Sequence, residues 1–388
     1  MKREALMDHR VTIISCQDYT QAAEQLALLI QRLGGIERYA RPGETLLLKA
    51  NLLAAAAPDQ ALSTHPAVVA AAAKLCAAQG AKAVIADSPG GPYLEAGMRR
   101  VYEKTGMAQA AAESGAELNY DLSARQVSLP EGKVLRSAQV ITPAASCDGM
   151  WNLCKMKTHT FMTMTGAVKN HFGLIPGVTK VGFHASHQDK ARFADMLLDL
   201  ALWASPRLNI MDAVLAMEGD GPGASGTPRQ VGLLLASEDP VALDAVAGAL
   251  MGVPPQENPV LLAAQRRGWT PCRAEDVELV GGTLEELRIP DFRLPGHVRT
   301  NIMERFGPFT QVVERASRSL MAQTPKIRPE ACIGCGICKN ACPAQAIAMR
   351  DKKAHVAPAR CIHCYCCHEL CPEQAVALKR GFLSRLLR

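Results

Sequence analysis

Two groups of cysteines near the carboxyl end have the residue type and spacing of metal ligands. Both follow Cys-x2-Cys-x2-Cys-x3-Cys-Pro, first in "CIGCGICKNACP" from residue 332 and again, 29 residues later, in "CIHCYCCHELCP". Three thiolates on one tight loop can bind three irons of a cubane cluster. Structural zinc sites also use Cys-x2-Cys pairs, but they need neither the third cysteine nor the proline. The pattern therefore favours iron–sulfur clusters over zinc.

This spacing resembles that of the bacterial two-cluster ferredoxins over about 55 residues, and in that family the fourth cysteine of each group binds the other cluster. The resemblance implies two [4Fe–4S] clusters. One would be bound by Cys332, Cys335, Cys338 and Cys371, and the other by Cys361, Cys364, Cys367 and Cys342. Cys366 breaks the spacing, so we interpret it as a buried thiol that binds no iron. We expect His363 and His368 at the surface.

A second concentration of reactive side chains lies in "KMKTHTFMTMTGAVKNHFGLIPGVTKVGFHASH", residues 155 to 187. Four of the ten histidines fall within 29 residues here, together with Lys155, Lys157, Lys169 and Lys180. The first two lysines and His159 alternate along a predicted strand, which places them on one face. The next predicted helix begins near Lys169, Asn170 and His171, and a helix amino end favours anions. The alternative is a buried, methionine-rich helix with incidental histidines.

We favour an anion-binding active site, because cations, hydroxyls and imidazoles rarely gather so densely without a function. Its predicted catalytic residues are His159, His171, Lys157 and Lys169. Further polar side chains follow predicted strands in "LLLKANLL", "IADSPGG" and "IMDAVLAMEGDGPGASG", and open α/β sheets bind ligands at such ends. The predicted cofactor-binding residues are Lys49, Asn51, Asp87, Ser88, Asn170, Asp212 and Glu218. "GDGPGASG" is neither of the two common glycine-rich phosphate-binding fingerprints, so no nucleotide site is predicted.

The elements that must position these residues alternate between strand and helix patterns. Strands are predicted at 11–15, 45–51, 134–141, 149–157, 207–214 and 230–237, and residues 82–91 are predicted as a strand that runs into a Gly/Pro turn. Helices are predicted at 19–35, 65–80, 93–115, 188–204 and 239–252. This alternation indicates an α/β fold with a mostly parallel sheet. We therefore divide the chain into an α/β body (1–280), a connector that wraps the core (281–326) and a ferredoxin domain with a basic tail (327–388).

Composition sets the remaining expectations. The chain has 388 residues and 14 cysteines, its first residues contain no apolar signal region, and no run approaches about twenty apolar residues. We therefore expect a cytoplasmic protein in a reducing compartment, with no membrane partner. Residues 327–388 hold ten Lys and Arg against four Asp and Glu, which equals the whole chain's net charge of +6. Without clustered aromatics this excess argues against nucleic-acid binding. We predict that the basic module docks onto the body, and the alternative is a merely solvated tail.

Several of these motifs together resemble the iron–sulfur proteins grouped as domain of unknown function 362. They are "KAN", "DSPGG", "KMKTH...TGAVKNHFGLIPG", "IMDAVLAMEGDGPGASG" and "DPVALDAVA", spread over roughly residues 11 to 280. Members of that family often carry a carboxyl-terminal ferredoxin module, so the resemblance implies this architecture and a redox association.

The histidine segment is also similar to lactate racemase, whose cleft lies between two α/β lobes. That similarity implies a two-lobed body. It would make His159, His171, His184 or His187 acid–base or metal-binding groups and Lys169 an anchor for cofactor or substrate.

Our leading hypothesis is an iron–sulfur oxidoreductase whose clusters pass electrons to an anionic small molecule in the α/β cleft. A soluble donor of the ferredoxin or flavodoxin type would supply the electrons, Lys157 and Lys169 would hold the anion, and His159 or His171 would supply protons. A flavin or another cofactor could also occupy the cleft. Two alternatives remain open: an electron-transfer or maturation protein that docks a partner, and a racemase-like or lyase enzyme with non-redox clusters.

Overall fold

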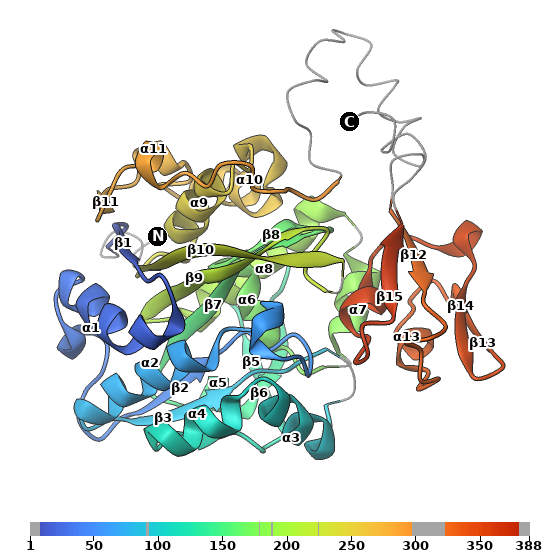
Figure 1. Cartoon of the computed structure of the whole chain (residues 1–388), viewed down its shortest axis with the longest axis horizontal. Coiled ribbons are helices and arrows are strands. Elements are labelled where there is room, and N and C mark those ends of the chain that lie inside the picture. Colours follow the sequence, from blue (N-terminus) through green and yellow to red (C-terminus); the bar gives the residue numbers. More distant parts are fainter. Residues whose placement is uncertain are drawn as a thin grey trace, which may run out of the picture.

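The computed structural model describes residues 8–90, 93–177, 179–187, 189–223, 225–296 and 323–379. These residues form an α/β body and a smaller carboxyl-terminal domain that lies beside it (Figure 1). Among the described helices, none is long and apolar enough to cross a membrane.

One nine-stranded sheet runs through the body in the order β11-β1-β10-β9-β7-β2-β3-β4, with β8 added to β7. Strands β4, β3, β2, β7 and β9 are parallel to one another, and β10 is antiparallel to β1 and β9. The mostly parallel α/β class is confirmed, and the two expected lobes share this one sheet. Its strands are β1 (Val11–Ser15), β2 (Thr45–Lys49), β3 (Lys82–Ala86), β4 (Glu117–Leu118), β7 (Gly149–His159), β8 (Thr163–Thr165), β9 (Leu208–Gly219), β10 (Gly226–Ser237) and β11 (Leu279–Val280).

Helices cover both faces of this sheet, with α1 to α4 on one side and α9 to α11 on the other (Figure 1). Successive side chains of a strand point to opposite faces of the sheet. Leu46 and Leu48 therefore pack against the helices α1 to α4, while Leu47 packs on the opposite face. The helices of the body are α1 (Ala22–Arg32), α2 (Pro66–Ala78), α3 (Glu95–Lys104), α4 (Met107–Ser114), α5 (Thr142–Ser146), α6 (Ala167–Asn170), α7 (Thr179–Ser186), α8 (Lys190–Ala204), α9 (Pro240–Leu250), α10 (Pro259–Arg266) and α11 (Leu284–Leu287).

The structure differs from the sequence predictions at a few elements. The helix predicted over 93–115 is two helices, because Gly106 adopts a left-handed φ of 75° between α3 and α4. The strand predicted at 134–141 pairs outside the main sheet, as β6 (Ser137–Ile141) against β5 (Ala124–Ser128). Part of the predicted connector does pack on the core, since Phe292 is buried beside α9. Residues 297–322 of the connector lie outside the described residues.

The carboxyl-terminal domain consists of two antiparallel strand pairs and two one-turn helices. Strand β12 (Thr324–Ile327) pairs with β15 (Val376–Lys379), and β13 (Ile347–Arg350) pairs with β14 (Lys353–Val356). Helix α13 (Ile337–Asn340) follows the first cysteine loop, and α14 (Cys366–Glu369) follows the second. Because β12 begins at Thr324, this domain starts slightly before the predicted boundary at residue 327.

The small domain contacts the body at several points, and an ion pair between them has its cation on the body and its anion on the small domain, the reverse of what the basic charge of that domain predicted. Arg100 of α3 forms an ion pair with Glu373 at 2.7 Å. The backbone N–H of Leu378 donates to the Ser225 hydroxyl at 3.1 Å. Gly90 leaves no room for a side chain, because a Cβ there would lie 2.5 Å from Leu370. The tail itself, residues 380–388, lies outside the described residues.

Candidate functional site

Four cysteines line a cavity of the small domain that measures about 360 Å³ with its open mouth included. Cys332, Cys335 and Cys338 come from the first loop, and Cys371 comes from the second. Apolar side chains such as Ile327 and Val376 complete the walls. Among the described residues, no three His, Cys, Asp or Glu side chains converge closely enough for a single metal ion. Four thiolates spread around a cavity are instead the donor set that a cubane cluster needs.

The remaining ferredoxin-type cysteines form a second group. Burial raises the pKa of Cys361, and the nearby thiols of Cys364 and Cys342 raise it further. Burial likewise raises the pKa of Cys367 well above its ordinary value, with additional increases from the neighbouring thiols of Cys364, Cys361, Cys338 and Cys342. Around the first cavity, three cysteines of one loop thus face the fourth cysteine of the other. For the second group this exchange stays a prediction that the ferredoxin resemblance implies.

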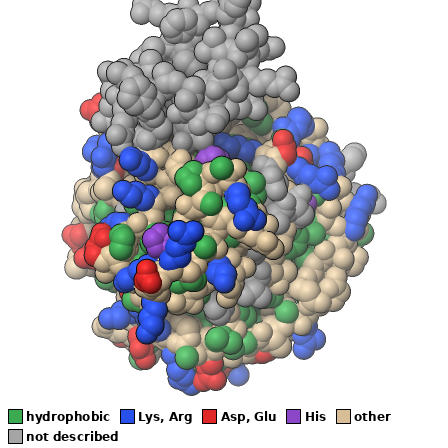
Figure 2. All heavy atoms as spheres, turned by 90° about the vertical axis from the view of Figure 1, so that its right-hand side faces the viewer, with side chains coloured by type: hydrophobic (Ala, Val, Ile, Leu, Met, Phe, Trp, Pro, Cys, Tyr) green, Lys and Arg blue, Asp and Glu red, His purple; other side chains and the backbone are tan. Residues whose placement is uncertain are grey.

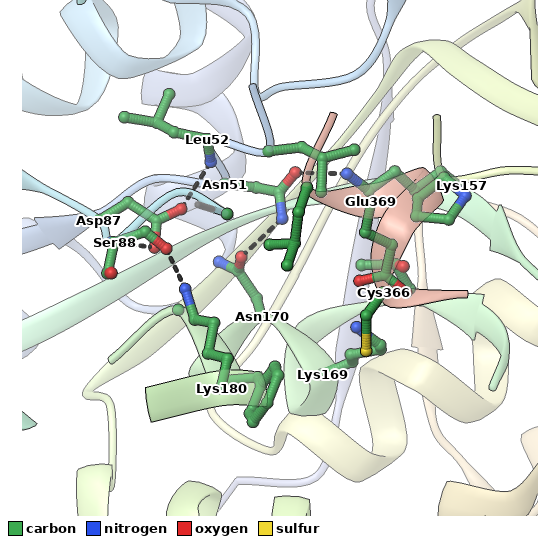
Figure 3. A pocket seen from close by; sticks show the side chains of 17 residues that line it. Asn51, Leu52, Asp87, Ser88, Lys157, Lys169, Asn170, Lys180, Cys366 and Glu369 are labelled. Atoms are coloured by element: carbon green, nitrogen blue, oxygen red, sulfur yellow. Dashed lines mark hydrogen bonds between the residues drawn. The ribbon is translucent and has the colours of Figure 1, made fainter. Parts of the chain in front are cut away.

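A pocket lies where the small domain meets the body (Figure 3). It measures about 640 Å³ with its open mouth included. Its body side is formed at the carboxyl ends of β2, β3 and β7, which meet at one edge because these strands are parallel. Its other wall is α14 of the small domain. The polar side chains that line it are Asn51, Asp87, Ser88, Lys157, Thr165, Lys169, Asn170, Lys180, Cys366 and Glu369.

A row of buried amides fixes one wall of this pocket. The side-chain amide of Asn152 donates to Asn209, and that of Asn170 donates to Asn152, at 2.8 and 2.7 Å. Asn51 then donates to the Asn170 oxygen at 2.9 Å and accepts from the Lys157 ammonium at 2.6 Å. Each amide orients the next, so the Lys157 ammonium has a fixed position.

Burial controls the charge of Lys157. The Lys157 ammonium also donates to the Leu62 carbonyl at 2.7 Å, but no described carboxylate forms an ion pair with this ammonium. Burial, together with the nearby ammonium groups of Lys169 and Lys155, lowers the pKa of Lys157 to about 7. Lys157 therefore changes charge near neutral pH.

Lys180 and Lys49 approach the pocket from its other side. The Lys180 ammonium donates to the backbone carbonyl of Ser88, and burial lowers its pKa to about 7. Lys49 lies behind the pocket wall, fully buried, with its ammonium 2.9 Å from the Asp87 carboxylate. Gly173 permits this approach, because a Cβ there would clash with both Asp87 and Lys49.

Three further groups, the Lys169 ammonium and the hydroxyls of Ser88 and Thr165, can donate hydrogen bonds that no described residue accepts. Burial lowers the pKa of Lys169, whereas Glu369 and Cys366 raise it. Among the described residues the Lys169 ammonium has no hydrogen-bond partner, although it lies 5.6 Å from the centre of the Phe172 ring. The hydroxyls of Ser88 and Thr165 are buried and also lack a partner within the described part of the chain. An anion with several oxygens could bind all three.

His159 and His171 do not line the pocket. The Nδ1 atom of His159 accepts from the backbone N–H groups of Phe161 and Met162, so its ring proton belongs on Nε2, which faces Glu369 at 3.2 Å. His159 therefore contacts Glu369, a residue of the pocket wall, without lining the pocket itself. The Nδ1 atom of His171 lies 3.2 Å from the Val168 carbonyl, and burial lowers its pKa to about 3, with Lys49 adding to the effect.

The predicted anion site at a helix amino end is wrong. Helix α6 has only four residues, and the Asp244 carboxylate accepts from the backbone N–H groups of Ala167 and Val168 at 2.5 and 3.0 Å. A carboxylate already occupies the position where an anion would bind.

Two predicted cofactor-binding residues lie away from the pocket. Asp212 accepts from Lys155 at 2.7 Å and from the Tyr19 hydroxyl, and Glu218 forms an ion pair with Arg293 at 2.8 Å. Lys155 is thus neutralised. His187 is buried near the Phe183 carbonyl, and the side chain of His184 lies outside the described residues.

The sequence prediction missed the contribution of α14. Cys366 packs in one apolar group with Leu370 and Cys364, and it also lines the pocket. The expected surface position of His368 is wrong: it is 2% exposed, because α14 faces the body, and it bonds the Val376 carbonyl. The one signal in the sequence was the extra cysteine that interrupts the spacing.

Fold and cysteine groups together define an α/β protein with an iron–sulfur domain, and comparisons with known proteins agree. Residues 46–249 match the family described as domain of unknown function (DUF362), and residues 324–372 match a 4Fe-4S dicluster domain. A thylakoid-associated protein of Synechocystis sp. is 33% identical over 312 residues, which cover 75% of this chain and 92% of that protein. The chain belongs to the DUF362 family and is an iron–sulfur protein.

Among solved structures, the lactate racemase apoprotein from Thermoanaerobacterium thermosaccharolyticum is similar at a TM-score of 0.38 and 12% identity. The match covers 61% of this chain and 55% of that chain. A likeness at this level supports no conclusion about the reaction.

Proposed function

We propose that this protein is an iron–sulfur oxidoreductase that reduces an anionic small molecule in the pocket between the body and α14. The observation that carries the proposal is the shared wall. Cys366 and Glu369 of the iron–sulfur domain line the same pocket as Lys157, Lys169 and Lys180 of the body. Cys366 packs in the same apolar group of side chains as Cys364, a proposed iron ligand, so a bound molecule would lie close to the redox centre.

The proposal includes two [4Fe–4S] clusters, with the two ligand sets that the ferredoxin spacing implies. When bound, these clusters supply single electrons. The residues of the chain would do the rest. The three lysines would hold the anion, and Phe172, Leu52 and Leu370 would limit the access of water. Lys157 and Lys180 would also exchange protons at neutral pH, because their pKa values of about 7 suit that task. A flavin in the pocket stays a prediction.

The electron donor would dock on the outer side of the iron–sulfur domain. Ile333 is 63% exposed beside the cavity of the first cysteine group, and Cys335 of that group is exposed. Exposed Lys339 and Lys352 flank them, and Figure 2 shows Lys and Arg side chains spread over this face of the molecule. An apolar centre with a basic rim suits a small acidic protein that carries one electron.

The test is reoxidation of the reduced protein. Anaerobic protein reduced with dithionite would be mixed with 2-oxo acids, enoates and their phosphorylated counterparts, and cluster absorbance would be followed by stopped flow. Lys169→Gln should slow reoxidation by an active acceptor at least about tenfold, because a charged hydrogen bond is lost. The matched control Lys74→Gln, on the exposed face of α2, should not. Turnover of any compound with the clusters held oxidised would instead support the non-redox enzyme.

A further inference from the structure

The pocket has two separate groups of unused donors, at opposite ends. At one end, Ser88 has a buried hydroxyl without a partner among the described residues, and the Lys180 ammonium is bonded to the carbonyl of the same residue. That leaves two N–H bonds of Lys180 for a ligand. Ser88 follows β3, and Lys180 lies in the first turn of α7.

The other end lies beside the iron–sulfur domain. Thr165 is paired with Lys157 across β7 and β8, so both side chains project to the same side. The Thr165 hydroxyl is buried without a partner in the described part of the chain, and Lys169 lies close to Glu369 and Cys366. Figure 3 shows Ser88 and Lys180 on one side of the pocket, Lys157 and Cys366 on the other, and Asn51 and Asn170 between them.

Donors left unpaired in a buried site are costly, so a ligand that accepts from them gains affinity. A single small oxyanion could satisfy one end only, because the two amides separate the ends. We infer that the substrate is an elongated dianion, with one anionic group at Ser88 and Lys180 and the other at Thr165, Lys157 and Lys169. The reacting atom would lie at the second end, next to Cys366. This inference rests on the proposed function, whose substrate class it names.

Isothermal titration would test it on the intact protein with its clusters oxidised, so that no electron transfer takes part. The probes are butyrate, succinate, glutarate and 2-phosphoglycolate. The first carries one anionic group and the others two, and the last distinguishes a phosphate from a carboxylate at one end. We expect at least one dianion to bind about tenfold or more tightly than butyrate. Lys180→Met and Lys169→Met should each reduce this advantage to less than about threefold, and Lys74→Met should preserve it.

Equal binding of butyrate and every dianion, or no binding of any probe, would overturn the inference. So would a dianion preference that survives both lysine substitutions. Ser88→Ala serves as a milder second variant, and thermal melting with iron analysis identifies any variant that fails to fold. Dianion binding without reoxidation of reduced clusters would leave the two-ended site standing and would contradict the proposed function.

Discussion

Anion binding in the pocket should be coupled to proton uptake. Burial is the main reason that Lys157 and Lys180 have pKa values of about 7, far below the ordinary lysine value. At pH 8 each ammonium is therefore formed in only about a tenth of the molecules. An anion bound beside them favours the charged form and raises both pKa values. Binding at pH 8 should then take up close to two protons, roughly 0.9 for each lysine.

The same coupling fixes the sign and size of the pH dependence. Affinity must fall as pH rises, because protons are taken up on binding. Between pH 7 and pH 9 the charged fraction of each lysine falls from about one half to about one hundredth. Affinity for an anion should decrease on the order of a thousandfold if both lysines contact it, and on the order of fiftyfold if one does.

Succinate is a suitable probe, because it offers a carboxylate to each end of the pocket and its own charge is constant over this range. Isothermal titration at pH 8 in two buffers with different ionisation enthalpies measures the proton uptake directly. Lys157→Met and Lys180→Met should each remove about one proton from the uptake, and the control Lys74→Met should remove none. Affinity that is independent of pH, or an uptake below about 0.3 protons, would refute the reasoning.

Other predictions concern single residues. Cys366→Ser should leave the iron and sulfide content unchanged, whereas Cys367→Ser should lose or convert a cluster; equal losses would contradict the ligand assignment. His159→Ala should lower the free energy of unfolding by about 1–3 kcal/mol, because two buried backbone N–H groups lose their acceptor; an unchanged melting temperature would place His159 outside this network. Asp244→Ala should lower the free energy of unfolding by a similar amount, because the backbone N–H groups of Ala167 and Val168 at the start of α6 lose their acceptor. Chemical denaturation can measure this loss.

Buried Lys157 should also affect stability with pH. Its folded pKa lies below its unfolded one, so the unfolded chain binds more protons between about pH 7 and pH 10. The wild-type protein should therefore gain stability relative to Lys157→Met as pH rises through that window. If the difference in melting temperature between the wild-type protein and Lys157→Met stayed constant across that pH window, Lys157 would not be buried as described.

Much of the body could be predicted from sequence, because its strands are short apolar runs that end at polar or glycine-rich segments. The pocket was partly predictable for the same reason. Parallel strands bring their carboxyl ends to one edge, so Asn51, Asp87 and Ser88 could be grouped although they are distant in the chain.

What the sequence could not show is which charged groups are already neutralised. Asp212 is paired with Lys155, 57 residues away, and Glu218 with Arg293, 75 residues away. No local pattern indicates such pairs. The role of α14 depends on domain docking, which is set by shape and by scattered contacts such as that between Arg100 and Glu373. For these reasons Cys366 and Glu369 emerge only from the structure.

The most direct test of the central claim is a redox titration of the protein, followed by electron paramagnetic resonance, with and without sulfate at pH 6. At that pH Lys157 and Lys180 are mostly protonated already, so a bound sulfate adds negative charge to the pocket. Sulfate beside Cys366 should lower the midpoint potential of one cluster on the order of tens of millivolts and leave the other unchanged. Lys169→Met should abolish the shift. Unchanged potentials for both clusters, or an equal shift that persists in Lys169→Met, would contradict a substrate pocket adjoining the redox centre.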